Sequence, residues 1–207
     1  MAIETFGLYL VITNPVTSFE ACAEAAVSAN LRYIQLRMKK AARDAVVAVA
    51  ANLRSITRGT QTRFIVNDDP SIAAEVGADG VHLGQDDLPL DQARSLYPTL
   101  KLFGLSTHNP EQARQAAGLS PDYCGVGPVF ATPTKEIPDP ALGPDRAGAI
   151  IRAAPFTTVA IGGINAENLG DVLRAGAVNF SVVRHVCLSP RPYDAIRQLQ
   201  DIWQTYQ

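Results

Sequence analysis

Short runs of apolar, β-branched residues recur along the whole chain, and an alanine-rich amphipathic segment follows most of them. Each run is almost continuously apolar, which is typical of strands buried on both faces. This alternation predicts β–α units that build a parallel sheet. The eight predicted strands cover residues 8–13, 33–37, 63–67, 80–84, 102–107, 123–127, 158–163 and 180–184.

The segments between the strands carry signals for the starts of helices. Ser18 precedes apolar residues at helical spacing, which predicts an N-cap and a first helix. Residues 41–57, dense in Ala, Val and Leu, predict the clearest helix. Pro70, Pro89 and Pro110 each stand just before another apolar-periodic segment, where the missing N–H costs little.

Eight strands and eight helices without a Pro/Ser-rich linker predict an α/β fold, a single closed (β/α)₈ TIM barrel formed by residues 1–207 as one domain. An open, doubly wound sheet is the alternative, but such a sheet has no reason to stop at eight units. The hydrophobic fraction of 47% and the charged fraction of 18% are ordinary for a globular protein and argue against disorder.

Charge and cysteine content limit the partners of the protein. Lys and Arg number 18 against 20 Asp and Glu, so the chain lacks the basic excess that nucleic acid binding needs. No stretch approaches the roughly 18 apolar residues of a membrane span, and the first residues lack the basic charge of a signal peptide. Cys22, Cys124 and Cys187 form no CxxC pair, which favours reduced thiols. We therefore expect a cytoplasmic protein that acts on small molecules, without nucleic acid or membrane, with a homo-oligomer left open.

The active site of a TIM barrel lies at the carboxyl ends of its strands, so the residues that end each predicted strand are the candidates. These residues are unusually polar. They are Gln35, Arg37 and Lys39; Asn67, Asp68 and Asp69; Gln85, Asp86 and Asp87; Ser106, Thr107 and His108; Gly162 and Gly163; and Arg184. Residues 128–143 form a long proline-rich connection without periodicity, which predicts a lid that carries Thr132, Thr134 and Lys135.

The acidic residues on this rim suggest a metal site. Asp68 and Asp87 follow neighbouring strands and could hold one Mg²⁺, which proteins usually bind through one or two carboxylates together with substrate phosphates. For Asp69 and Asp86, a helix cap or a solvated loop residue is the competing interpretation.

The basic residues on the same rim suggest an anionic substrate. Arg37, Lys39 and Lys135 beside a carboxylate-bound Mg²⁺ suit a diphosphate, since Arg makes forked contacts to phosphate and Lys acts as a point charge. Gly162 and Gly163 end the seventh predicted strand, where barrels often bind a second phosphate, although a Gly-Gly pair by itself is more often a turn. His82 lies within a strand and is expected in the core or the barrel lumen, and no hydrolytic triad is indicated.

Six segments together resemble those of a known family. They are QLRMK at 35–39, VNDD at 66–69, GADGVHLGQDDL at 77–88, GLSTHN at 104–109, GVGPVFATPTK at 125–135 and VAIGGI at 159–164. In this order and spacing they resemble the thiamine-phosphate synthases. The resemblance implies a (β/α)₈ transferase with Mg²⁺ as its cofactor. It would join 4-amino-2-methyl-5-(hydroxymethyl)pyrimidine diphosphate to 4-methyl-5-(2-phosphoethyl)thiazole, giving thiamine phosphate and pyrophosphate.

The resemblance also implies roles for individual residues. Gln35 would orient the pyrimidine, and Asp68 and Asp87 would hold Mg²⁺. The residues that would hold the diphosphate are Arg37, Lys39, Asn67, Ser106 and Lys135, of which Arg37, Lys39, Ser106 and Lys135 would be catalytic. The residues implied near the thiazole phosphate are Thr132, Thr134, and the backbone amides of Gly163, Val183 and Arg184. The implied reaction is dissociative and needs charge stabilisation and positioning more than a base.

Arg184 is the main departure from the family, which typically carries a small residue such as Ser at this position. It could add a contact to the phosphate, narrow the pocket or serve a different substrate. Two alternatives therefore stay open: a related thiazole tautomerase, against which the retained diphosphate-binding residues argue, and a phosphate-binding paralogue without turnover.

Overall fold

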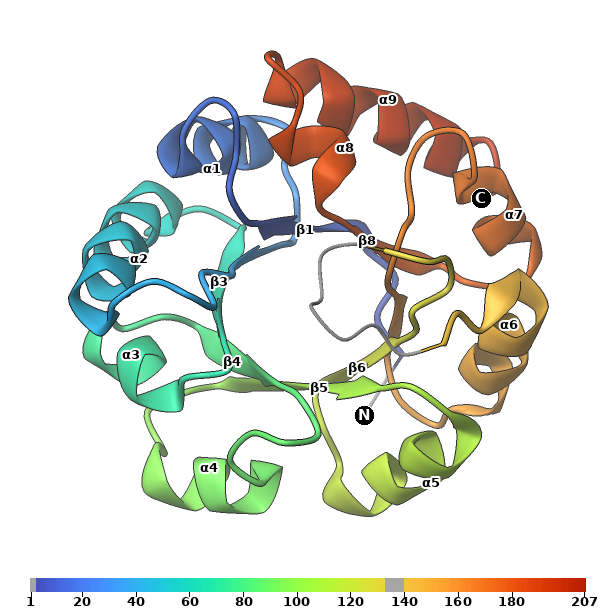
Figure 1. Ribbon diagram of the computed structural model, residues 1–207, viewed down its shortest axis with the longest axis horizontal. Helices are drawn as coiled ribbons and strands as arrows, with labels where there is room; N and C mark the ends of the chain where they lie inside the picture. Colours follow the sequence, from blue (N-terminus) through green and yellow to red (C-terminus); the bar gives the residue numbers. More distant parts are fainter. Residues whose placement is uncertain (1–2, 133–139) are drawn as a thin grey trace.

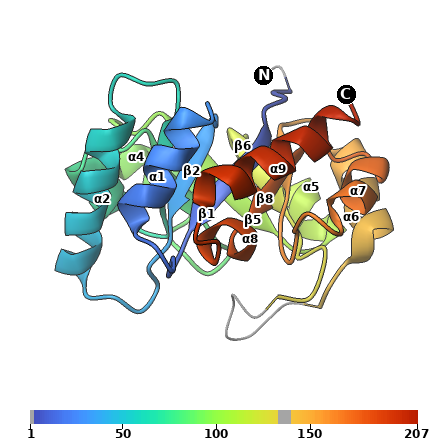
Figure 2. The same ribbon diagram turned by 90° about the horizontal axis from the view of Figure 1, so that it is seen from above.

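The structure of the protein is a computed structural model, and it describes residues 3–132 and 140–207. Eight parallel strands form a closed barrel in sequence order, with β8 paired to β1, and helices surround the strands (Figures 1 and 2). The predicted TIM barrel is thereby confirmed, and the open sheet is not the fold. The strands are β1 (Gly7–Ile12), β2 (Tyr33–Leu36), β3 (Arg63–Asn67), β4 (Gly80–Leu83), β5 (Leu102–Thr107), β6 (Tyr123–Val126), β7 (Thr158–Ala160) and β8 (Asn179–Val182).

The helices begin where the predicted caps and prolines stand. Ser18 caps the first helix, because its side chain accepts a hydrogen bond from the Ala21 N–H. Pro70 and Pro110 occupy the first turns of their helices, and Pro89 is the N-cap residue of α4. The helices are α1 (Phe19–Ser28), α2 (Arg43–Thr57), α3 (Pro70–Glu75), α4 (Leu90–Leu96), α5 (Pro110–Leu119), α6 (Gly143–Ala153), α7 (Leu169–Arg174), α8 (Arg184–Cys187) and α9 (Pro192–Gln204).

The prediction for the last strand was wrong at its carboxyl end. β8 ends at Val182, and Arg184 begins α8, a short helix that brings the described chain to nine helices instead of eight. Val183 leaves the extended conformation, with φ −118° and ψ −78°. The apolar pattern did not reveal this turn, because Val186 and Cys187 of α8 are buried like strand residues.

The seventh predicted strand, residues 158–163, was also too long, since β7 ends at Ala160. The Ile161 N–H still donates to the Val126 carbonyl oxygen at 2.9 Å. Gly162 and Gly163 then adopt φ values of +93° and +70°, which glycine reaches without steric cost and which turn the chain away from the barrel.

Alternate residues of each strand face the helices or the barrel lumen. In β1, Leu8, Leu10 and Ile12 belong to the large core between strands and helices, whereas Tyr9 and Val11 belong to a smaller cluster inside the barrel. The lumen is thus packed with side chains, and the polar rim stands above this packed floor. The three cysteines are buried and form no disulfide.

None of the helices in the described part of the chain has both the length and the apolar character needed to cross a membrane.

Candidate active site

The acidic residues predicted to hold a metal come together at the ends of β3 and β4. Asp68 follows β3 in the left-handed region, with φ +65°, and its N–H donates to the His82 carbonyl oxygen at 2.8 Å. Asp87 lies in the turn after β4, where its Oδ2 accepts a hydrogen bond of 2.6 Å from the Gly84 N–H. The two carboxyl groups interact directly with each other.

Electrostatics at this pair favour a cation. Partial burial raises the pKa of Asp87; the neighbouring Asp68 carboxylate raises it further, while the Gly84 N–H and Lys39 lower it. The Lys39 ammonium already pairs with Asp68, with Nζ 2.9 Å from Oδ2. Two neighbouring carboxylates have the chemistry of a divalent metal site that phosphate oxygens and water could complete. No cluster of three or more His, Cys, Asp or Glu side chains suited to a metal occurs in ranges 3–132 and 140–207.

Asp69 lies beside this pair but serves the fold. Its Oδ1 accepts hydrogen bonds from the Ser71 and Ile72 N–H groups at 2.8 and 3.1 Å and thereby caps α3. The interpretation of Asp69 as a helix cap is therefore confirmed, and Asp68 is the residue of this Asp-Asp pair that faces Lys39.

Arg37 connects the acidic pair to a cavity. Burial of its guanidinium lowers the pKa of Arg37, and the nearby Asp68 carboxylate partly offsets this effect. The cavity, of about 230 Å³, lies between the ends of β1 and β2 and helix α8. Its lining residues are Thr13, Asn14, Arg37, Val183, Arg184, Cys187 and Leu188. Two arginine residues therefore line one small space, which suits an anion.

Gln35 and Ser106 lie deeper, at the boundary between the rim and the lumen. The Gln35 Nε2 donates to the Tyr9 hydroxyl at 3.0 Å, and Gln35 is buried. The Ser106 Oγ lies 2.8 Å from the Nε2 of His82. Of the two places predicted for this histidine, the core and the lumen, the lumen is the one observed. Asn67 ends β3 in register with His82.

Tyr9 and Tyr123 also belong to this region, and the sequence analysis missed both. Their hydroxyl oxygens lie 2.7 Å apart across the lumen, although the residues are 114 positions apart in the chain. The sequence offers one signal for each of them, a tyrosine at an inward-facing position of a predicted strand. This signal does not show which residue the hydroxyl group contacts.

The second predicted phosphate site is placed in part. Gly163 has its positive φ at the end of β7, and its carbonyl oxygen accepts a hydrogen bond of 3.0 Å from Asn168 Nδ2. A Cβ at Gly163 would lie 2.7 Å from the Cβ of Phe130, so only glycine allows this close approach.

The predicted lid is described only at its ends. The Phe130 N–H donates to the Gly162 carbonyl oxygen, and the Leu142 N–H donates to the Pro128 carbonyl oxygen, so both ends of the connection are fixed at the rim. Thr132 is half-buried. Thr134 and Lys135 lie outside the described residues.

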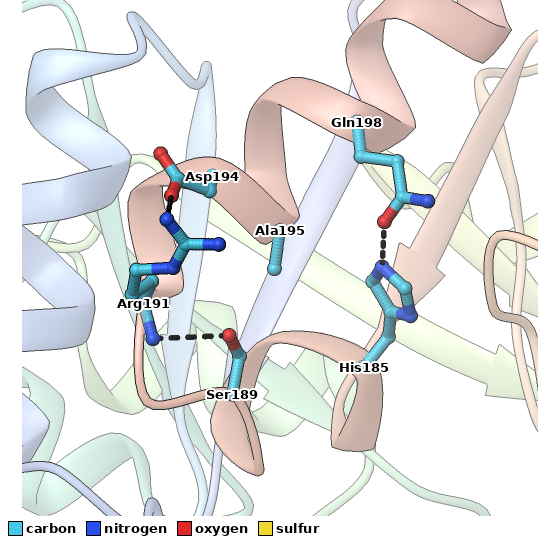
Figure 3. A pocket seen from close by; sticks show the side chains of 6 residues that line it. All are labelled: His185, Ser189, Arg191, Asp194, Ala195 and Gln198. Carbon is cyan, nitrogen blue, oxygen red and sulfur yellow. Dashed lines mark hydrogen bonds and ion pairs between the residues drawn. The ribbon is translucent and has the colours of Figure 1, made fainter.

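A further cavity, of about 320 Å³, lies between α8 and α9 (Figure 3). Its polar side chains bind one another: Arg191 pairs with Asp194, and His185 Nε2 lies 3.1 Å from Gln198 Oε1. These side chains are paired with one another and are not among the residues predicted to bind the substrates or Mg²⁺.

Comparisons with known proteins show what this chain is similar to. Residues 8–186 match the family model described as thiamine monophosphate synthase. The chain is 42% identical over 199 residues to the thiamine-phosphate synthase of Methanospirillum hungatei, covering 95% of this chain and 97% of that protein. It is also 42% identical to the thiamine-phosphate synthase of Synechocystis sp., but covers only 56% of that longer protein. Among solved structures, the thiamine phosphate pyrophosphorylase of Pyrococcus furiosus superposes with a TM-score of 0.86 at 30% identity, covering 97% of this chain and 96% of that one.

Proposed function

Because this chain belongs to the thiamine monophosphate synthase family, we propose that it joins the pyrimidine diphosphate to the thiazole phosphate to give thiamine phosphate and pyrophosphate. In this reaction the bond between the pyrimidine methylene carbon and the diphosphate oxygen breaks, and its electron pair leaves with the diphosphate. The thiazole nitrogen then forms the new C–N bond with its lone pair. The observation that carries the proposal is the meeting of Lys39, Asp68 and Asp87 beside Arg37 on one rim.

The acidic pair and Lys39 would act on the leaving group. Asp68 and Asp87 would hold Mg²⁺, which when bound supplies positive charge to the departing diphosphate. Lys39, whose Nζ lies 2.9 Å from Asp68 Oδ2, would exchange this contact for one with a diphosphate oxygen. The diphosphate would be held by Arg37, Lys39, Asn67, Ser106 and Lys135.

The other substrate groups would occupy the floor and the small cavity. Gln35, buried at the end of β2, would orient the pyrimidine ring. The thiazole phosphate would lie toward the 230 Å³ cavity, which Val183 and Arg184 line. The Gly163 amide would contribute from the end of β7. Thr132 and Thr134 would approach the phosphate from the connection after β6. We place the activity in the cytoplasm, where the three buried thiols would stay reduced.

The test is pyrophosphate release from the purified protein with both substrates, with Mg²⁺ and again with excess chelator. Release that requires both substrates and the metal is the expected result. Tautomerisation of the thiazole without pyrophosphate release would instead identify a tautomerase. Tight binding of a substrate without turnover would identify a binding paralogue.

The raised pKa of Asp87 gives the metal site a pH dependence. We expect Mg²⁺ affinity to fall as the pH decreases through this pKa, by up to about tenfold per pH unit, because the proton and the cation compete for the carboxylate. Calorimetric titration with Mg²⁺ from about pH 8 down to the ordinary aspartate pKa of about 4 measures the effect. Affinity that does not change over this range would contradict the assignment of Asp87 to the metal.

The exposed Arg184 provides a separate prediction for the thiazole end. Replacing Arg184 by serine should raise the KM for the thiazole phosphate about tenfold, with little change in the KM for the pyrimidine diphosphate, because one charge-assisted contact is lost. Arg58→Ser is the control, since Arg58 is also exposed but follows α2 at the opposite end of the barrel. Equal KM values for the two variants would show that Arg184 does not contact this substrate.

A further inference from the structure

A continuous chain of hydrogen-bonding groups crosses the lumen beneath the rim. Gln35 Nε2 lies 3.0 Å from the Tyr9 hydroxyl, and the Tyr9 hydroxyl lies 2.7 Å from that of Tyr123. The Tyr123 hydroxyl lies 3.2 Å from His82 Nδ1, and His82 Nε2 lies 2.8 Å from Ser106 Oγ. Five strands therefore contribute one member each, and the two ends are residues assigned to the substrate.

The chemistry of the groups decides which member of each hydrogen bond in this series is the donor. The Gln35 Nε2 can only donate, so the Tyr9 hydroxyl accepts there and its own proton goes to Tyr123. Tyr123, having accepted, donates to His82 Nδ1. Burial raises the pKa of both tyrosines well above the ordinary value, so both hydroxyl groups keep the proton that this order requires.

The same order of donors and acceptors continues through His82. With Nδ1 acting as acceptor, the neutral imidazole carries its proton on Nε2 and donates it to Ser106 Oγ. The Ser106 hydroxyl proton then remains available for another acceptor. In the reversed order, the Tyr9 hydroxyl would accept from both Gln35 and Tyr123, and no acceptor for its buried proton occurs in the part of the chain that the structure describes.

We infer that Tyr9, Tyr123 and His82 are positioning residues that fix Gln35 as an acceptor and Ser106 as a donor toward the substrate. The inference rests on the proposed function. The Gln35 Oε1 takes no part in this chain of hydrogen bonds. It can accept a hydrogen bond from the amino group of an aminopyrimidine. The Ser106 hydroxyl suits an oxygen of the diphosphate. One chain of buried hydrogen bonds thereby matches the hydrogen-bonding pattern at both ends of the same substrate.

The test removes one hydroxyl group from the middle of the chain. Tyr123→Phe should lower kcat/KM for the pyrimidine diphosphate about tenfold and leave the KM for the thiazole phosphate unchanged. Tyr33→Phe is the matched control, because Tyr33 lies in the same aromatic cluster but takes no part in the chain of hydrogen bonds. Its hydroxyl donates to Glu4 Oε2 at 2.9 Å. Thermal unfolding of both variants checks that each remains folded.

A readout that does not depend on turnover is the protonation of His82, measured by ¹⁵N NMR of the full chain. We expect an Nε2–H tautomer in the unmodified protein and a changed population in Tyr123→Phe. His108 serves as an internal reference for a protonated Nδ1, because its Nδ1 donates to the Gly127 carbonyl oxygen at 2.7 Å. The variants His108→Asn and His185→Asn assign the signals.

The two readouts separate failure of this inference from failure of the proposed function. An Nδ1–H tautomer of His82 in the unmodified protein would overturn the inference, and so would equal kcat/KM values for Tyr123→Phe and Tyr33→Phe. Absence of pyrophosphate release from the unmodified protein would overturn the proposed function. The NMR measurement would still decide the direction of the hydrogen bonds in the lumen.

Discussion

Replacing Asp87 by alanine is expected to lower Mg²⁺-dependent pyrophosphate release on the order of 10³-fold while the protein stays folded. Asp87 is one of two carboxylates that would share the cation, and Asp68 alone would hold it weakly. The expected loss follows because the positive charge that stabilises the leaving diphosphate contributes several kcal/mol to the transition state. Steady-state rates over a Mg²⁺ titration measure it.

Two further variants make this result specific. Asp86→Ala removes the adjacent, exposed carboxylate and should leave turnover near that of the unmodified protein. Asp87→Asn keeps an oxygen that can accept the hydrogen bond from the Gly84 N–H but removes the negative charge. A loss in Asp87→Asn similar to that in Asp87→Ala would therefore assign the effect to the charge and not to the turn. Normal turnover in Asp87→Ala would remove this residue from the metal site.

The position of this acidic pair could be predicted because the barrel repeats one local rule. Parallel strands in a closed barrel end on the same rim, so polar residues that follow apolar runs meet there whatever their distance in sequence. Lys39, Asp68 and Asp87 satisfy this rule from three different strand ends. The same argument located Gln35 and Ser106. For His82, a position within a strand predicted the core or the lumen without deciding between them.

The features that escaped prediction depend on pairing across the barrel or on the exact end of a strand. Tyr9 and Tyr123 meet through the lumen, and their contact requires the register of β1 and β6, which no short window of sequence contains. The sequence pattern extended the strand to Arg184 because the apolar run continues through Val183 into the turn, as it would in a longer strand. The place of Arg184 in the cavity lining depends on that turn.

Gly104 in β5 leads to the second large effect, this time on stability. A Cβ at this position would lie 2.3 Å from Cζ of Tyr123 and 2.6 Å from Nδ1 of His82. Both neighbours are buried and held by hydrogen bonds, so neither has space to move aside. Gly104→Ala should therefore lower the free energy of unfolding by about 3 kcal/mol, the upper part of the range for overpacking a core. Urea unfolding followed by circular dichroism measures the change.

The same substitution at Gly118 provides the control. Gly118 lies in α5, and a Cβ there meets nothing within 4 Å. Because alanine stabilises a helix relative to glycine, Gly118→Ala should raise the free energy of unfolding by roughly 0.5–1 kcal/mol. The two variants add one methyl group each, so opposite signs would show that the packed lumen, and not the loss of a glycine, sets the cost. If Gly104→Ala unfolded at the same urea concentration as the unmodified protein, the lumen would have room that the distances in the structure exclude. The buried hydrogen-bond chain could then not be held as closely as the geometry requires.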